Sequence, residues 1–239
     1  MTARLAGCWF LTIAAVFAQA PAFEVASIKP SAADATRMNI QRDPGGGIVL
    51  TGVNLQTLVS MAYNIQPFQL SGGPPWLRSK RFDVVAKAPI DAAKSQTWAM
   101  LQTLLGDRFQ LAVHREIREL SIFELVVAKG GPKIQPAHRA PSPADDFIQA
   151  FPGRMKALMV SMSGLALTLS GTLGHQVINR TNLEGRYDFQ LEFVPEDAAD
   201  SDRPSIYSAL QEQLGLKLET SKGPVQMIVI DRAELPAAN

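Results

Sequence analysis

Two short segments of this chain, far apart in the sequence, follow nearly the same pattern. The first begins with Arg81-Phe82-Asp83 and the second with Arg186-Tyr187-Asp188, and in both an alternation of apolar and polar residues follows. This period of two residues is typical of a β-strand that buries one face and exposes the other. Segments with the apolar spacing of an amphipathic helix precede and follow each strand. The pattern therefore predicts two copies of one unit that combines helices and strands.

In both copies the predicted order is helix, strand, helix, strand, strand. The segments with helical spacing are residues 54–65, 95–106, 162–174 and 205–215. The last two strands begin near Phe109 and at Leu120 in the first copy, and lie on either side of Gly223 and Pro224 in the second. An N-terminal strand and a β-hairpin around the glycines at residues 45–47 precede the first copy. We expect an α+β fold in which two related halves pack together.

A proline-rich stretch separates the two copies. Its prolines are Pro132, Pro136, Pro141, Pro143 and Pro152. Prolines at this density in a polar segment are typical of a linker or a long excursion. The predicted division of the chain is a signal peptide at residues 1–20, a first α+β half at 21–131, a linker at 132–160 and a second α+β half at 161–239.

The N-terminus has the features of a secretory signal peptide. Arg4 supplies a positive charge, residues 5–18 form an apolar run, and Ala18-Gln19-Ala20 fits a signal peptidase site. The run is short for a membrane span, which needs about 20 apolar residues. We expect a periplasmic or secreted protein with no membrane span after cleavage. Cleavage after Ala18 and an uncleaved N-terminal anchor are the alternatives.

The composition excludes several classes of function. Cys8 is the only cysteine and lies in the predicted signal peptide, so the mature chain would have no disulfide, thiol nucleophile or cysteine metal site. The formal net charge of +1 is unlike the basic surface that nucleic acid binding requires. His114, His138 and His175 lack the spacing of a helical metal site. We expect no metal, no cofactor and no nucleic acid partner.

The densest group of polar residues lies between residues 107 and 119. In an extended strand His114 and Glu116 share one face, and Arg108 and Arg118 continue that face. A histidine, a carboxylate and arginines together can bind an anion or act as acid and base. The alternative is a solvated strand face with weak ion pairs between neighbouring strands.

Two further features have both a structural and a functional interpretation. Trp76 lies in a loop rich in glycine and proline, where it either plugs the core or stacks on a sugar or peptide. Asp83 and Asp188 resemble a pair of catalytic carboxylates. Because they occupy corresponding positions in the two copies, equivalent structural ion pairs are the alternative. We assign no catalytic residue and regard Trp76, Arg108, His114 and Glu116 as candidate binding residues.

Five segments of the chain form a specific combination: FEVASIKPS, GGPPWLRSKRFDVVAKAP, LLGDRFQLAVHREIRELSIFELVVAKGGPKI, NRTNLEGRYDF and LQEQLGLKLETSKGPVQMIVID. Through these segments the chain resembles the soil-associated family of uncharacterised secreted proteins, described mainly from Acidobacteria. The resemblance covers residues 23–239, and Asn182 stands where that family usually has glycine. It implies export and a common fold, but no reaction. The resemblance implies that some relatives carry the domain behind a membrane-bound sensor peptidase domain.

From these observations we expect a non-enzymatic binding or interaction module of the cell envelope. Its partner would be an envelope protein, a peptide or a glycan. The alternative is an envelope-associated hydrolase that uses a cluster of His114, Glu116 and Arg108. A deep pocket lined by this cluster would favour the enzyme, whereas a shallow surface with an exposed sheet edge would favour the module.

Overall fold

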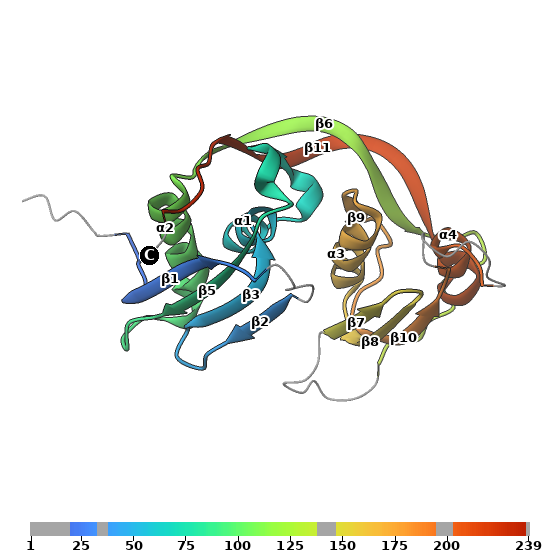
Figure 1. Ribbon diagram of the computed structural model, residues 1–239. Coiled ribbons are helices and arrows are strands. Elements are labelled where there is room, and N and C mark those ends of the chain that lie inside the picture. Colours follow the sequence, from blue (N-terminus) through green and yellow to red (C-terminus); the bar gives the residue numbers. More distant parts are fainter. Residues whose placement is uncertain (1–19, 33–37, 138–146, 195–202, 238–239) are drawn as a thin grey trace, which may run out of the picture.

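The structure is a computed structural model that describes residues 20–32, 38–137, 147–194 and 203–237. The predicted signal peptide, apart from Ala20, lies outside the described residues. Helices and several sheets are both present, so the predicted α+β class is confirmed. Figure 1 shows two lobes joined by a long, arched ribbon of two strands. We call residues 20–111 the first lobe and residues 147–215 the second lobe.

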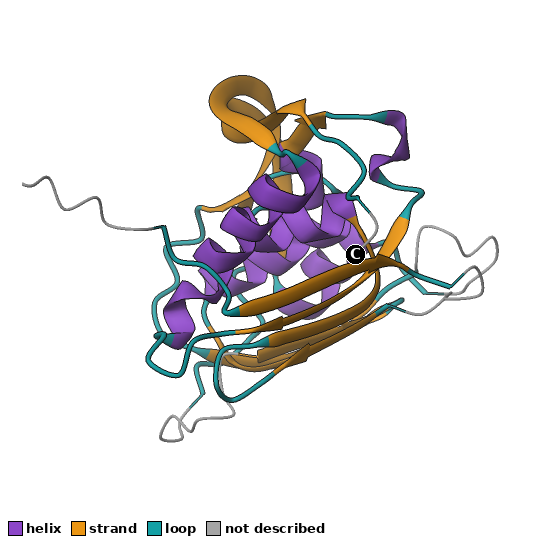
Figure 2. Cartoon of the chain, turned by 60° about the vertical axis from the view of Figure 1, so that its left-hand side comes forward, coloured by secondary structure: helices purple, strands orange, loops and turns teal. Residues whose placement is uncertain are grey.

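The first lobe contains a four-stranded antiparallel sheet. In spatial order its strands are β1 (Val25–Pro30), β5 (Arg81–Lys87), β3 (Ile48–Asn54) and β2 (Asn39–Arg42). Helices α1 (Leu55–Tyr63) and α2 (Thr97–Phe109) pack on one face of this sheet (Figure 2). On β5, Phe82, Val84 and Ala86 are buried in the core of the lobe. The alternation seen in the sequence is therefore an alternation of buried and exposed faces.

Short elements complete the first lobe. They are the 3-10 helices η1 (Pro67–Gln69), η2 (Pro75–Leu77) and η3 (Lys94–Gln96), and the strand β4 (Leu70–Gly72). Helix α1 begins where predicted, because the Asn54 side chain accepts a hydrogen bond from the Thr57 nitrogen at 2.9 Å. Helix α2 continues past Gly106 and ends at Gln110, which has a left-handed conformation. The predicted helix end at Gly106 is therefore wrong.

The second lobe contains a three-stranded antiparallel sheet. Its strands, in spatial order, are β10 (Tyr187–Glu192), β8 (Arg154–Val160) and β7 (Phe147–Phe151). Its helices are α3 (Met162–Leu173), which the Ser161 side chain caps, and α4 (Ile206–Ala209), which continues as a π-helical turn η4 (Leu210–Leu214). Phe189 on β10 is only 8% exposed, as expected from the apolar alternation that follows Arg186 and predicted a strand with one buried face.

Part of the predicted linker belongs to the second lobe. Residues 147–160 form the hairpin β7–β8, which supplies Met155, Ala157 and Val160 to the core. The linker prediction is therefore wrong for these residues, because the prolines obscured the short alternation of β8. The predicted domain division is otherwise untested and stays a prediction.

The ribbon consists of β6 (Ala112–Val127) and β11 (Leu216–Arg232), which pair antiparallel along nearly their whole length. Each was predicted as two strands, and each is one. Gly223 and Pro224 pair with Leu120 and Glu119 without breaking β11. Strand β4 pairs with β11 only at residues 228–230. At Pro224, β11 therefore has no β4 neighbour on that side. Proline has no backbone N–H to donate, and a position without a neighbouring strand on one side tolerates this.

The two ribbon strands exchange lobes. Beyond the centre of the ribbon β6 enters the second lobe, where Phe123 pairs in parallel with Val177 of β9 (Val177–Asn179) and Leu125 joins the core. In the same way β11 enters the first lobe, where Ile228 pairs in parallel with Leu70 of β4 and joins the core. Each lobe therefore completes its core with a strand that leads out of the other lobe (Figure 1).

The order of elements is the same in the two parts of the chain. Each has a β-hairpin, a helix, a short strand, a longer strand, a helical segment and one ribbon strand. The hairpins are β2–β3 and β7–β8, and the short strands are β4 and β9. A common origin of the two halves is not established by this order, and the internal duplication stays a prediction.

Candidate functional site

The residues singled out in the sequence lie in three different places. His114 and Glu116 are on the ribbon strand β6, where His114 is about half exposed. Nδ1 of His114 lies 2.9 Å from Oδ1 of Asp231 on β11, and Nε2 lies 3.9 Å from Oε2 of Glu116. Arg118 forms an ion pair with Glu116. Asp231 thus completes the cluster. From the sequence, only the members of the cluster on β6 were predicted.

Carboxylates determine the protonation of His114. The hydrogen bond to Asp231 raises the pKa of His114 above the usual value of 6.5; desolvation lowers it, and the charges of Asp231 and Glu116 add to the increase. A general base needs one ring nitrogen that faces a nucleophile or a water. Here both nitrogens face carboxylates. The cluster therefore fits a solvated ion-pair network better than a hydrolytic centre.

Arg108 is not part of this cluster. It lies in the last turn of α2, is partly buried, and its Nη2 donates to the Ala26 carbonyl oxygen at 3.4 Å. The prediction that Arg108 shares a strand face with His114 is wrong, because the segment before Gln110 is helical.

Trp76 lies in η2 and is partly buried against the first core. Its ring stacks on Phe109 with the centroids 6.3 Å apart, and meets the edge of Phe82 at the same separation. Offset and edge-to-face pairs of this kind stabilise a core. The contacts support the interpretation of Trp76 as a plug of the core.

A groove between the two lobes was not predicted. It has a volume of about 540 Å³ and lies between η1 of the first lobe, α3 and β9 of the second, and the middle of β11. We call it the interlobe groove. Its lining residues are Gln66, Phe68, Gln69, Ser163, Ala166, Leu167, Ser170, Gln176, Val177, Ile178, Asn179, Pro224 and Gln226. No signal in the sequence joined these segments, because they meet only through the exchange of ribbon strands.

Hydrogen bonds fix one wall of the interlobe groove. Gln69 accepts from the Gln66 nitrogen through Oε1 and donates through Nε2 to the Gln226 carbonyl oxygen, both at 2.9 Å. On the opposite wall, Asn179 donates to the Ser163 hydroxyl at 3.3 Å. The two lobes approach closely here, since a Cβ atom added to Gly171 of α3 would lie 3.0 Å from Oε1 of Gln66.

Other side chains in the interlobe groove lack partners in the protein. Within the described residues the side-chain amides of Gln176 and Gln226 make no hydrogen bond, and Leu167 is 61% exposed. Phe68 and Gln176 also line an adjoining pocket of about 290 Å³ beside Leu120 and His175. The two hollows therefore form one elongated surface with free amide groups and apolar patches.

The lining of the interlobe groove is uncharged. Among the described residues that form it, there is no aspartate, glutamate, lysine or arginine. Among the residues that the structure describes, no group of three or more histidine, cysteine or acidic residues is arranged to hold a metal. Nor does any helix in the described part of the chain have the length and apolar character that a membrane crossing requires. Because its described lining is uncharged, the interlobe groove can offer a ligand hydrogen bonds and apolar contacts but no ion pair.

The comparisons with known proteins give a family and no activity. No curated protein and no solved structure matches this chain. A family model described as a protein of unknown function, DUF3738, matches residues 56–233. This range includes the whole lining of the interlobe groove and both strands of the ribbon. The chain therefore belongs to the DUF3738 family of proteins of unknown function.

Proposed function

We propose that this protein is an exported, non-enzymatic binding module of the cell envelope, and that the interlobe groove holds its ligand. The observation that carries the proposal is the set of unpaired groups in the groove. The Gln176 and Gln226 amides have no protein partner among the described residues, and the side chain of Leu167 is left largely in solvent. Export rests on the N-terminal segment with Arg4 and Ala18-Gln19-Ala20.

The ligand that fits this surface best is an uncharged peptide segment with apolar side chains. Glutamine amides offer both a donor and an acceptor, which match the N–H and C=O groups of a peptide backbone. Phe68, Leu167 and Pro224 offer apolar contacts for its side chains. A strongly charged ligand would find no opposite charge in the lining and would lose its hydration without compensation.

A hydrolase is the second candidate, because His114 is hydrogen-bonded to Asp231 as a catalytic histidine often is to a carboxylate. The position of Glu116 beside the other ring nitrogen and the exposure of His114 weigh against it. A panel of ester, peptide and glycoside substrates tests this candidate. Turnover that is lost in His114→Ala would establish the hydrolase.

Binding arrays of immobilised peptides and of glycans test the proposed function on the exported form, residues 21–239. We expect uncharged peptides with apolar residues to be retained. Leu167→Asp should weaken their binding at least about tenfold, because it places a charge on an apolar contact surface. Gln226→Ala removes one free amide and should weaken it about threefold to tenfold.

The matched control is Ile90→Asp. Ile90 is 99% exposed in a loop of the first lobe and does not line the interlobe groove. It should keep peptide binding within about twofold, since it lies outside the contact surface. Retention of glycans alone would contradict a peptide ligand. Peptide binding that is unchanged in both groove variants would show that the groove is not the site.

A further inference from the structure

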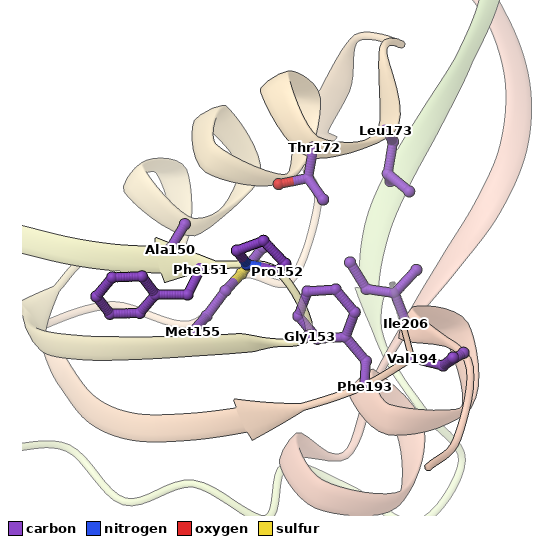
Figure 3. A pocket seen from close by; sticks show the side chains of 10 residues that line it. All are labelled: Ala150, Phe151, Pro152, Gly153, Met155, Thr172, Leu173, Phe193, Val194 and Ile206. Atoms are coloured by element: carbon purple, nitrogen blue, oxygen red, sulfur yellow. The ribbon is translucent and has the colours of Figure 1, made fainter. Parts of the chain in front are cut away.

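We propose that the second lobe has a separate site for a small, neutral aromatic ring with one hydrogen-bond donor, such as a phenol. The site is a pocket of about 310 Å³ where the β7–β8 turn meets the end of α3 and the start of α4 (Figure 3). We call it the hairpin pocket. Its lining residues are Ala150, Phe151, Pro152, Gly153, Met155, Thr172, Leu173, Phe193, Val194 and Ile206.

The floor of the hairpin pocket favours an aromatic ligand. Met155, Phe193 and Ile206 are buried, and each belongs to the core of the second lobe. A ring can meet Phe193 edge to face and contact the Met155 sulfur, both of which favour aromatic over aliphatic groups. The volume is at the low end of the roughly 300–1,000 Å³ of ligand pockets, so it suits one or two rings.

Two backbone N–H groups beside the hairpin pocket are already paired within the protein. The Phe193 nitrogen donates to the Gly153 carbonyl oxygen at 3.0 Å, and the Val194 nitrogen donates to the Pro204 carbonyl oxygen at 2.8 Å. These N–H groups are therefore unavailable to a ligand. Among the residues that the structure describes, no arginine, lysine or histidine lines the pocket. A carboxylate there would be desolvated without a cationic side chain among the described residues, which is unfavourable.

Thr172 determines the polar group of the ligand. Of the lining residues that the structure describes, it is the one whose side chain can form a hydrogen bond of ordinary strength, and it extends from α3 toward the hairpin turn (Figure 3). Its hydroxyl donates to the Thr168 carbonyl oxygen at 3.1 Å. The single proton is thus committed and the oxygen remains an acceptor. A ligand O–H or N–H at the rim can donate to it.

The first lobe has an aromatic ring of its own at a comparable place. Between the β2–β3 turn and the start of α2, a pocket is lined by Trp98, Arg42 and the glycines Gly46 and Gly47. The Arg42 guanidinium lies 4.5 Å from the centroid of the Trp98 ring. In the second lobe the start of α4 offers Ile206 at the hairpin pocket. The aromatic ring of a ligand bound in the hairpin pocket would therefore occupy the place in the second lobe that the Trp98 indole occupies in the first.

Methionine-methyl NMR of the exported form tests this site, with phenol, toluene and benzoate as probes. Met155 is assigned with a Met155→Leu variant. We expect phenol to shift the Met155 signal with a Kd of about 0.1–1 mM, in keeping with so small a ligand. Toluene should bind about fivefold more weakly, and benzoate should not bind. Absence of a shift with phenol, or tighter binding of benzoate, would overturn the proposal.

Two variants locate the bound ring. Thr172→Val keeps the shape of the side chain and removes the hydrogen-bond acceptor. It should weaken the binding of phenol about fivefold and leave the Kd of toluene within about twofold. Ala150→Phe should fill the pocket and abolish both, because Ala150 pairs with Met155 on the inner face of the sheet. Its control is Gln149→Phe, which adds the same ring on the outer face beside Lys156.

If phenol binds Ala150→Phe as it binds the parent, the hairpin pocket is not the site. Leu167→Asp should leave phenol binding unchanged, because Leu167 lines the interlobe groove and not this pocket. The two proposals can therefore fail independently.

Discussion

Oδ1 of Asp188 accepts a hydrogen bond from the backbone nitrogen of Met159 at 2.6 Å. Met159 has a φ of 53°, a left-handed conformation that is uncommon outside glycine. Arg186, the residue directly before β10, donates to the Met159 carbonyl oxygen at 2.8 Å. Both backbone groups of this residue are thus held where the pairing of β8 and β10 shifts register.

The first lobe has the same arrangement. Asp83 accepts from the Gly52 nitrogen at 2.9 Å, and Arg81 donates to the Gly52 carbonyl oxygen at 2.7 Å. Gly52 has a φ of 67°, and the pairing of β3 and β5 shifts register between Leu50 and Val53. The two aspartates lie in different lobes, so they do not form a pair of catalytic carboxylates.

Asp188→Ala tests the first of these arrangements. We expect it to lower the free energy of unfolding by about 1–2 kcal/mol, because the Met159 nitrogen loses its partner in a strained conformation. Urea denaturation measures the change. Gln190→Ala, two residues along the same exposed face of β10, is the control and should cost less than about 0.5 kcal/mol. Equal costs would show that the hydrogen bond contributes nothing.

Phe189→Ala should destabilise the protein by about 3–5 kcal/mol. The ring is 8% exposed and lies in the core of the second lobe, so truncation loses burial and leaves a cavity. Denaturant melts followed by circular dichroism give the value. A variant as stable as the parent would contradict the packing described for β10.

The His114–Asp231 pair should make stability depend on pH. Because the folded pKa is raised above 6.5, protonated His114 stabilises the fold below about pH 6.5, and this contribution is lost as the pH rises through the folded pKa. His114→Ala should therefore be more destabilising at pH 5 than at pH 9. Asp231→Asn should remove most of that difference. A cost independent of pH would exclude the pair as its source.

Intact-mass measurement of protein recovered from the envelope or medium tests the predicted export. We expect a mass that begins after Ala18 or Ala20, because the preceding residues have the pattern of a signal peptide. Replacing Ala18 and Ala20 with bulky residues should leave the precursor unprocessed. A native mass that includes Met1 would contradict cleavage.

The predicted duplication can be measured by superposing an experimental structure on itself. We expect residues 54–129 and 162–231 to overlay as the same ordered elements, with Arg81-Phe82-Asp83 on Arg186-Tyr187-Asp188. The shared register shifts and hydrogen bonds at Gly52 and Met159 motivate this expectation. If these residues fall in different places, the halves are unrelated.

Local patterns were enough to predict several elements of the fold. The alternation at Phe82 and Val84, and at Tyr187 and Phe189, identified β5 and β10, since a half-buried strand imposes a period of two. The cap at Asn54 located the start of α1. These features depend on residues that are neighbours in the sequence, so local sequence patterns are sufficient to predict them.

Features that depend on distant partners were missed. Gly223 and Pro224 resemble a turn, yet they continue β11 because β6 pairs with them along the ribbon. Arg108 was placed on a strand because Gly106 resembled a helix end, whereas packing against the first core extends α2 to Phe109. The interlobe groove joins segments more than a hundred residues apart, so no local pattern could have indicated it.

The exchange of ribbon strands has a consequence for how this chain can be divided. A fragment that stopped after residue 131 would lack Ile228 and Ile230, which fill the first core, and a fragment that began there would lack Leu125, which fills the second. We therefore expect that neither lobe can be deleted without loss of the other. The molecule should therefore lose its structure in a single step when denatured, and truncations made for crystallisation should spare both ends of the ribbon.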